Sequence, residues 1–315
     1  MSKATIRSIA GKLNIAPATV HRALSGSGSV ALSTRRRIIR CANESGYILP
    51  ERNSRNIAVL VPHFRFFGYM AQMLSALEKV LHEHCYHVQL IPEADIAVLG
   101  DHMFDGIISM VWLEGEVLSL PQEYPIPMVS LNSAFSMPEN ISLVASGKDG
   151  ILQALNYLKR HNCRRIFFVS TLTEKNPIAS ERLASFRQFC NENAVDFDRM
   201  HRAVSASEVE SVLPDILISR ADGVFCASET FAFRLGRAMQ KQGIAIPGDI
   251  SLMGMEDEQL NTSFDPPITA IRQDFEKLAR ATVEVLASAI EKHIPVRNIR
   301  VPYTLIERSS VRNCD

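Results

Sequence analysis

The apolar residues beyond position 56 follow a repeating pattern. Short apolar runs, such as residues 57–61, alternate with longer stretches in which apolar residues recur every three or four positions. The runs are typical of buried strands and the longer stretches of amphipathic helices, so their alternation predicts parallel sheets covered by helices on both faces. The helices are expected around residues 69–84, 149–161, 180–193 and 230–242.

This repeating part is longer than one such sheet needs, because folding units usually contain about 100–200 residues. We therefore predict that residues 57–315 form two linked α/β subdomains, each a doubly wound parallel sheet. The first lobe is expected over about 57–145 with a late segment near 275–300, and the second over about 146–272. Ligands bind outside the carboxyl ends of strands in such sheets, so the ligand site is expected in a cleft between the lobes.

Residues 1–47 carry a different pattern, which predicts a small all-α domain of three helices. In the first helix, Thr5 is placed to cap the N-terminus, and four apolar residues share one face: Ile6, Ile9, Ala10 and Leu13. The second helix begins near Pro17, and a third spans about residues 32–45 before Gly46 ends it. The first two helices and their tight turn form a helix-turn-helix pattern.

Charge divides the chain at the same boundary. The whole chain has 34 basic and 34 acidic side chains and a formal net charge of zero. Residues 1–55 contain ten Lys or Arg and two Glu, a net charge of +8, which leaves −8 for the rest. A basic head on an acidic body predicts that the head binds a polyanion.

Several other classes of protein are disfavoured. No apolar run is long enough to span a bilayer and no signal peptide is visible, so we expect a cytoplasmic protein with no membrane partner. The six cysteines are scattered, which favours reduced thiols. No nucleophile elbow, phosphate loop or HExxH motif is present, and His82, His84 and Cys85 do not converge as metal ligands. We expect no enzyme, no cofactor and no metal.

The helix-turn-helix pattern predicts docking in the major groove of DNA. Arg22 is the candidate for a bidentate guanine contact, with a phosphate clamp as the alternative. His21 is either a donor to a phosphate or base, or a solvent-exposed bystander. The full set of candidate DNA-binding residues is Thr5, Arg7, Pro17, Ala18, Thr19, His21, Arg22, Ser29, Arg35, Arg52 and Arg55.

The first fifty residues contain a series of short segments in a characteristic order and spacing: Thr5-Ile6, Asn14-Ile15, residues 18–24, Gly28-Ser29-Val30, Thr34 and residues 44–47. This series resembles the DNA-binding headpiece of the lac repressor (LacI/GalR) family. Two departures concern helix caps, because the serines that usually open the second and third helices are Ala16 and Ala31 here. Loss of such a cap typically costs about 0.5–2 kcal/mol.

The linker, residues 48–56, is shorter than the family's usual linker, and the hinge helix of the family is not recognisable in it. Two interpretations remain open. In one, a shortened hinge contacts DNA through Arg52 and Arg55; in the other, the segment is a plain tether.

The body resembles the family's effector domain, which is similar to periplasmic sugar-binding proteins. The matching segments are residues 104–108, 164–166, 182–186, 221–225, 243–251, Gly254 and residues 266–269. The resemblance implies that an arginine, two acidic residues and an asparagine bind an effector: Arg182, Glu229, Glu256 and Asn132. A guanidinium and carboxylates suit a polyhydroxylated ligand, most simply a sugar or sugar derivative.

Further residues are expected to line the same pocket. Three aromatic residues follow the first strand and either stack on a sugar or belong to the core or a dimer interface: Phe66, Phe67 and Tyr69. Ser228 is a further effector-binding candidate, and Val204 and Phe275 are weaker candidates for the wall. The chain has Ser228-Glu229 where the family usually has Asn-Asp, and Glu256 where it usually has Asp. A vestigial or permanently closed cleft is the alternative to a functional one.

These observations predict a sequence-specific transcriptional regulator, most often a repressor in this family, whose operator affinity is controlled by a small polar effector. A homodimer on pseudo-palindromic double-stranded DNA is expected, since paired headpieces gain affinity and register. The candidates for its interface, with the core as the alternative, are Met70, Met73, Leu74 and Leu77. A cytoplasmic sugar-binding sensor with a vestigial or non-sugar effector site is the competing function, and the basic head argues against a transport protein.

Overall fold

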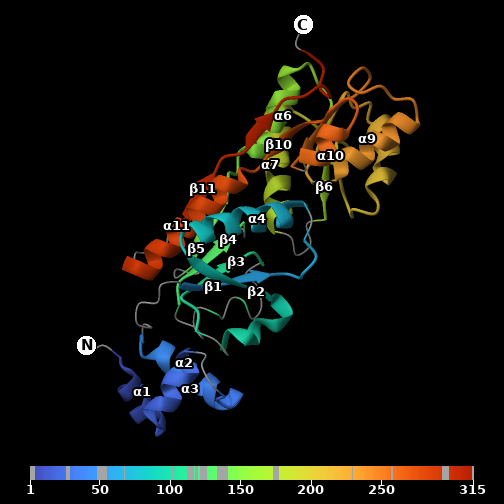
Figure 1. Ribbon diagram of the computed structural model, residues 1–315. Coiled ribbons are helices and arrows are strands. Elements are labelled where there is room, and N and C mark those ends of the chain that lie inside the picture. Colours follow the sequence, from blue (N-terminus) through green and yellow to red (C-terminus); the bar gives the residue numbers. More distant parts are fainter. Residues whose placement is uncertain are drawn as a thin grey trace. The chain divides into compact units, whose positions relative to one another are not determined.

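The computed structural model describes residues 4–25, 29–47, 55–66, 68–100, 103–111, 117, 120, 126–132, 141–172, 177–228, 230–256, 258–292 and 298–313. The chain forms two compact units (Figure 1). The first unit contains residues 1–66, 73–145 and 276–299, and the second contains residues 67–72, 146–275 and 300–315. Each unit is therefore assembled from three separate stretches of the chain.

Three helices precede the first strand: α1 (Ile6–Leu13), α2 (Pro17–Ser25) and α3 (Leu32–Glu44). They pack through aliphatic side chains that include Ile9, Val20 and Ile38. The predicted cap of α1 is confirmed, because the Ser8 amide donates to the Thr5 hydroxyl at 3.1 Å and the Thr5 amide donates to the Ser8 hydroxyl at 2.9 Å. At α3, Ala31 gives no side-chain cap, as its sequence predicted.

The first unit contains a six-stranded sheet in the order β11-β5-β4-β3-β1-β2. Its strands are β1 (Arg55–Val61), β2 (Tyr86–Pro92), β3 (Gly106–Ser109), β4 (Met128–Leu131), β5 (Ser142–Ser146) and β11 (Asn298–Val301). The pairings from β2 across to β5 are parallel. The accompanying helices are α4 (Gly68–Glu83), the 3-10 helix η1 (Glu93–Gly100) and α11 (Phe275–Lys292).

Two residues of α4 that were candidates for a dimer interface lie instead in the core of the first unit. Met73 and Leu77 are both fully buried, and an apolar stripe on a helix packs equally well on its own sheet. Met70 and Leu74 are half-buried.

The second unit contains a six-stranded sheet in the order β12-β10-β9-β8-β6-β7. Its strands are β6 (Ile166–Thr171), β7 (His201–Val204), β8 (Gly223–Cys226), β9 (Ser251–Met255), β10 (Thr269–Arg272) and β12 (Thr304–Ile306). The pairing of β12 with β10 is antiparallel, and the other four pairings of this sheet are parallel. The strand order reverses beside β6, since β7 lies on one side of it and β8 on the other.

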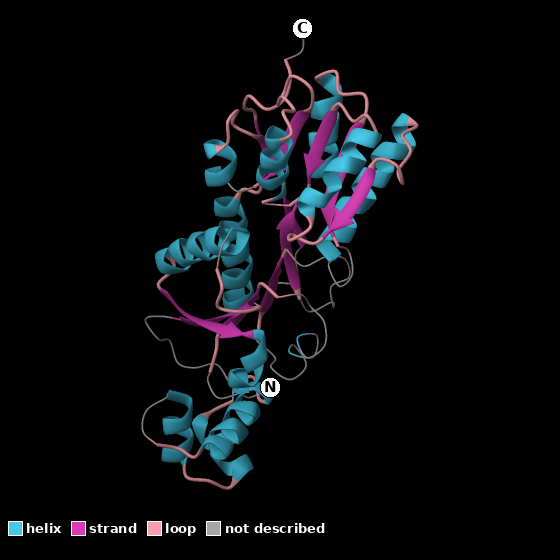
Figure 2. Ribbon diagram, turned by 90° about the vertical axis from the view of Figure 1, so that its right-hand side faces the viewer, coloured by secondary structure: helices cyan, strands magenta, loops and turns pink. Residues whose placement is uncertain are grey.

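Helices flank the second sheet on both faces (Figure 2). They are α6 (Gly150–Arg160), α7 (Pro177–Asn193), the 3-10 helix η2 (Val209–Val212), α8 (Leu213–Ile218), α9 (Phe231–Lys241) and α10 (Glu258–Ser263). Large aromatic side chains fill the space between helices and sheet, among them the fully buried Phe167, Phe168, Phe186, Phe225 and Phe231. The prediction of two parallel α/β sheets is confirmed.

The structure moves the end of the predicted linker. β1 begins at Arg55, so residues 55 and 56 belong to the first sheet, and residues 48–54 lie outside the described residues. The Arg55 guanidinium lies 3.2 Å from the Asp105 carboxylate, which also accepts from the Asn56 amide at 2.8 Å. Arg55 is thus tied to the sheet by an ion pair, and its contact with DNA stays a prediction.

Within the part of the chain that the structure describes, no helix has the length and apolar character needed to cross a membrane.

Candidate functional site

The helix α2 has two unlike faces. Val20, Ala23 and Leu24 are buried against the neighbouring helices. The opposite face is exposed and carries four candidate residues, Pro17, Ala18, His21 and Arg22, while Thr19 is half-buried between the faces. The Arg22 Nε donates to the Ala18 carbonyl at 3.3 Å, which lays the guanidinium along the helix surface. A protruding helix with one cationic and several short side chains has the form required to enter a major groove.

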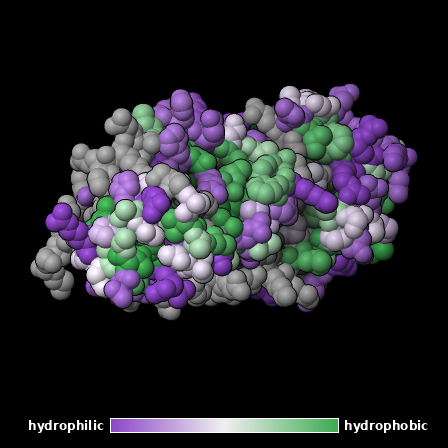
Figure 3. Space-filling model, turned by 60° about the horizontal axis from the view of Figure 1, so that its bottom comes forward, coloured by the Kyte–Doolittle hydropathy of each residue, from purple (hydrophilic) through white to green (hydrophobic). Residues whose placement is uncertain are grey.

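The other N-terminal candidates surround this face to different degrees. Thr5, Arg7 and Ser29 are exposed, and Arg35 is half-buried. Three further arginines of α3 are exposed: Arg36, Arg37 and Arg40. Figure 3 shows hydrophilic residues, in purple, interspersed with apolar residues, in green, on the face that it presents. Arg52 lies outside the described residues.

In the second unit, polar side chains meet where β5, β9 and β10 end. The Ser146 hydroxyl donates to the Gln273 side-chain oxygen, and the Gln273 amide nitrogen donates to the Glu256 carboxylate. The same carboxylate oxygen lies 3.9 Å from the Arg182 guanidinium. Ser146, Gln273 and Glu256 are 7%, 4% and 3% exposed, so this is a buried polar cluster.

Tyr303 closes the cluster into a ring. Its hydroxyl is hydrogen-bonded to the side chains of Arg182 and Ser146. Burial raises the pKa of Tyr303, with the nearby Arg182 charge acting in the opposite direction. The tyrosine ring lies against Gly150, where an added Cβ would come within 2.1 Å of it, so a glycine is required at that position. We call the five residues Ser146, Arg182, Glu256, Gln273 and Tyr303 the polar ring.

Glu256 is held in an unusual backbone conformation. Its φ is 52°, in the left-handed region that most residues avoid. The conformation is fixed by two hydrogen bonds, from the Glu256 amide to the Ile271 carbonyl at 2.8 Å and from the Asn261 side chain to the Glu256 carbonyl at 2.5 Å. Strained residues of this kind concentrate at binding sites, where the surrounding structure holds them.

The position of the ring in the sheet supports a ligand site. Glu256 follows β9 and Gln273 follows β10 directly. The Arg182 Nη1 donates to the carbonyl of Ala227, just after β8, at 3.0 Å. These contacts lie at the carboxyl ends of β8, β9 and β10, the edge of an open α/β sheet where ligands bind, and β8 is the neighbour of β6, beside which the strand order reverses.

The remaining effector candidates are distributed over the two units. Tyr69 and Phe275 belong to the second unit, and their ring centroids are 5.7 Å apart. Ser228 and Val204 are half-buried, and Val204 packs on the core of the second unit. The candidates Phe67 and Glu229 lie outside the described residues.

Two candidates belong to the first unit. Asn132 directly follows β4, is 8% exposed, has a φ of 54° and donates its amide to the Val144 carbonyl at 2.8 Å. Phe66 lies edge-on to Phe64, with centroids 6.1 Å apart.

The sequence prediction missed three members of the polar ring, Ser146, Gln273 and Tyr303. None of them was among the candidates, although Gln273 stands between the apolar β10 and the candidate Phe275. A polar residue directly after a buried strand was the available signal. Tyr303 gave no such signal, because its part in the ring depends on how a distant segment packs.

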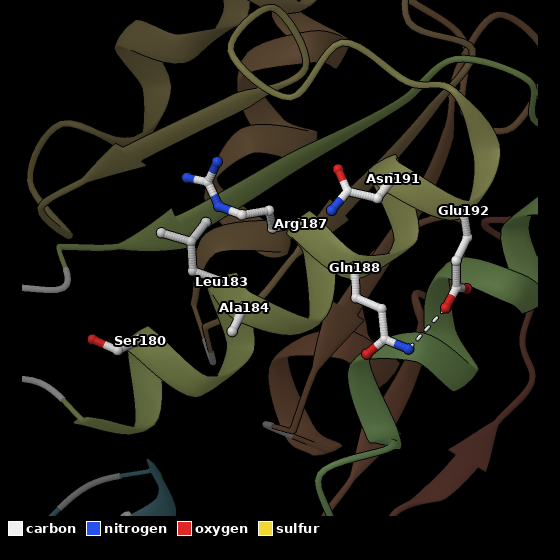
Figure 4. A pocket seen from close by; sticks show the side chains of 7 residues that line it. All are labelled: Ser180, Leu183, Ala184, Arg187, Gln188, Asn191 and Glu192. Atoms are coloured by element: carbon white, nitrogen blue, oxygen red, sulfur yellow. Dashed lines mark hydrogen bonds between the residues drawn. The ribbon is translucent and has the colours of Figure 1, made fainter.

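A separate hollow of about 530 Å³ runs along α7 (Figure 4). Its described lining consists of seven residues of that one helix, Ser180, Leu183, Ala184, Arg187, Gln188, Asn191 and Glu192. The Gln188 amide donates to Glu192 at 2.8 Å, and the Arg187 guanidinium lies 3.9 Å from the centre of the Phe197 ring. None of these lining residues was predicted to bind an effector.

Comparison with known proteins relates this chain to a family. Residues 155–311 match the periplasmic binding protein-like domain. The HTH-type transcriptional repressor CytR of Escherichia coli is 26% identical over 98% of this chain and 96% of its own length.

Two solved structures share the fold. A lac repressor dimer bound to operator and the anti-inducer ONPF has a TM-score of 0.72, with 17% identity over 99% of this chain and all of that chain. The complex of the transcriptional regulator CelR with cellobiose has a TM-score of 0.71, with 20% identity over 98% of this chain and all of that chain. The similarity includes the N-terminal helices as well as both sheets, and the curated relatives are transcriptional repressors rather than enzymes. Over nearly its whole length the chain is similar to transcriptional repressors of the lac repressor (LacI/GalR) family.

Proposed function

We propose that this regulator represses transcription by binding operator DNA through a helix-turn-helix headpiece formed by α1, α2 and α3. The division of α2 into a buried and an exposed face carries this proposal. Val20, Ala23 and Leu24 anchor the helix, and Arg22 is exposed on a face of short or polar side chains. The exposed arginines of α3 supply positive charge for phosphates, and the relatives named as HTH-type repressors support the same role.

Replacing Arg22 tests the DNA-binding face. Arg22→Ala is expected to weaken binding to the pseudo-palindrome upstream of the regulated genes by about 5- to 150-fold, the usual value of one bidentate base contact. Fluorescence anisotropy at several salt concentrations measures the loss. If Arg22 reads a base, Arg22→Lys lowers discrimination between operator and random DNA; if it clamps a phosphate, both affinities fall together.

A matched control for this experiment is Arg164→Ala, which removes an exposed arginine from the second unit. It should leave operator binding unchanged. Equal affinity of the unaltered protein for the pseudo-palindrome and for random DNA would refute a sequence-specific regulator and leave the sugar-binding sensor as the better function.

The proposed effector is a small polyhydroxylated molecule, a sugar or sugar derivative, bound at Arg182 and Glu256. A carboxylate accepts from two adjacent hydroxyls, and a guanidinium donates to two oxygens, so the pair is suited to a polyol. Its place at the carboxyl ends of β8 and β9 in the second sheet supports this assignment. One structural neighbour is a complex with cellobiose, which belongs to the same chemical class.

Thermal-shift measurements on a panel of sugars, polyols and their phosphates test the effector site. A ligand that binds the native state raises the melting temperature. Arg182→Ala should abolish the shift, whereas Arg187→Ala on the exposed side of the same helix should preserve it. An unchanged shift in Arg182→Ala would refute this site, and a panel with no active compound would favour the vestigial cleft.

We further propose a homodimer, because a single short recognition helix gains affinity and register when two headpieces bind a pseudo-palindrome. The structural neighbour bound to operator is a dimer. Sedimentation of the full chain tests this proposal, and a monomer at all working concentrations would contradict it.

A further inference from the structure

The chain crosses between the two units at three points besides the short stretch 67–72: after Ala145, after Phe275 and after Ile299. Within the second unit, the residues next to these crossings are bonded to one another. The Gly147 amide donates to the Val301 carbonyl at 2.7 Å, and the Arg300 guanidinium donates to the Ser146 carbonyl at 3.0 Å. The Ser146 hydroxyl donates to Gln273, two residues before the second crossing. Ser146 is therefore hydrogen-bonded to both of the other crossing segments.

Gln273 joins these crossings to Glu256. Its side-chain oxygen accepts from Ser146 and its side-chain nitrogen donates to Glu256, so each half of the amide has a different partner. The opposite orientation would bring the amide oxygen against the Glu256 carboxylate, and two acceptors repel. Chemistry thus fixes the orientation of the amide, and burial of all three side chains denies them water as a replacement partner.

A movement of the Glu256 carboxylate therefore has two outcomes. Either Gln273 follows it and shifts its contact with Ser146, or a buried amide loses its hydrogen bond. The second outcome is costly because the free energy of burying a polar group is recovered only when it is paired. The first outcome changes the geometry at the crossings.

We propose that Gln273 and Ser146 are positioning residues that transmit a displacement of the Glu256 carboxylate to the segments that connect the two units. The inference rests on the effector site proposed above, because a ligand at Arg182 and Glu256 would supply the displacement. Neither residue needs to touch the ligand. Tyr303 reinforces the link, since its hydroxyl is bonded to both Arg182 and Ser146.

The test uses the full chain without ligand or DNA, and Glu256→Asp supplies the displacement. This change keeps the negative charge but withdraws the carboxylate from Gln273 by one methylene. Hydrogen exchange of peptides covering residues 142–150 reports on the Gly147 amide, whose hydrogen bond joins two crossing segments. Glu256→Asp is expected to accelerate this exchange about tenfold, the factor that corresponds to the loss of one buried hydrogen bond.

The second variant, Ser146→Ala, removes the hydrogen bond between the Ser146 hydroxyl and Gln273. In a Ser146→Ala background, Glu256→Asp should add nothing to the exchange rate, because the connection is already broken. In a Ser170→Ala background the tenfold effect should persist. Ser170 is also a buried serine, lies in β6 of the same unit, and its hydroxyl is bonded to His201 at 2.9 Å, outside the polar ring.

Additivity separates transmission from a purely structural role. If the ring only stabilises the unit, Glu256→Asp accelerates exchange by the same factor with and without the Ser146 hydroxyl, and the proposal is overturned. No effect of Glu256→Asp in the unaltered background also overturns it. Should Ser146→Ala fail to fold, Gln273→Met breaks the same connection. Because the measurement includes neither ligand nor DNA, its failure is distinguishable from failure of the proposed regulator function.

Discussion

The exposed face of α2 and the polar ring of the second unit are built in opposite ways. The α2 candidates lie within residues 17–22, and most of them are exposed. The polar ring joins residues from position 146 to position 303, and its carboxylate is 3% exposed. Helical periodicity is sufficient to predict the first surface. The second depends on how distant strand ends meet, so it becomes visible only in the folded chain.

The hydrophobic packing of the two regions differs as well. The N-terminal helices pack through aliphatic residues such as Ile9 and Ile38. The second unit packs through aromatic residues, and the rings of Phe168 and Phe186 are stacked with centroids 4.6 Å apart. Aromatic side chains bury more area per residue, so single truncations should cost more in the second unit.

The largest expected effect comes from Phe186→Ala, which removes a fully buried ring from this stack. We expect the free energy of unfolding of the second unit to fall by about 3–5 kcal/mol, from lost burial and the cavity left behind. Denaturant unfolding followed by circular dichroism measures it. Phe64→Ala, at a residue 59% exposed, is the control and should be nearly neutral. Equal losses in both variants would contradict the aromatic core.

A smaller effect should follow from acid. Burial, and after it the nearby charges of Arg202 and Arg187, lower the pKa of His201 to about 4. The unfolded chain therefore binds a proton near its ordinary pKa of 6.5 while the folded chain does not. The contribution of neutral His201 to the free energy of unfolding is fully present above pH 6.5. It is lost as the pH falls toward 4, by up to about 3 kcal/mol.

Urea unfolding at a series of pH values measures this dependence on acid. His201→Phe places a further apolar ring among Phe168, Phe186 and Phe197 and removes the titrating group. The fall in stability below pH 6.5 should be smaller in this variant by the contribution of His201. An unchanged dependence would show that His201 is protonated in the folded chain.

The smallest expected effects come from replacing one glycine in each of the two regions. At Gly150, an added methyl group would meet the Tyr303 ring, so Gly150→Ala should destabilise the second unit by about 1–3 kcal/mol. At Gly11, inside α1, no atom lies within 4 Å of an added Cβ. Gly11→Ala should therefore stabilise the N-terminal helices by about 0.5–1 kcal/mol. Melting curves of the two variants should shift in opposite directions, and shifts of the same sign would contradict the packing at one of the sites.

The sequence predicted features that depend on near neighbours. The Thr5 cap, the uncapped Ala31 and the alternation of strands and helices follow from local spacing, and all are present. The apolar stripe of α4 could not distinguish a core from an interface, which is why Met73 and Leu77 were open to two interpretations.

Long-range contacts could not be predicted in the same way. Arg55 was expected to contact DNA because it is basic and follows the headpiece, but its partner Asp105 lies fifty positions away. Gln273 enters the polar ring through Ser146, which lies 127 positions away in the sequence. Tyr303 enters it through Arg182 and Ser146, which are also distant in the sequence. The resemblance to a family identified Arg182 and Glu256 as candidates. The polar ring that holds them could be recognised only in the folded structure.

The division of each compact unit among separate stretches of the chain has a consequence for synthesis. The first unit needs residues 276–299, and the second needs residues 300–313, so neither sheet is complete until nearly the whole chain has left the ribosome. Domains generally fold as units, starting from the N-terminus during translation. The three N-terminal helices therefore emerge more than two hundred residues before the domain proposed to control them is complete. A prematurely terminated chain would carry the proposed DNA-contacting helix without either finished sheet.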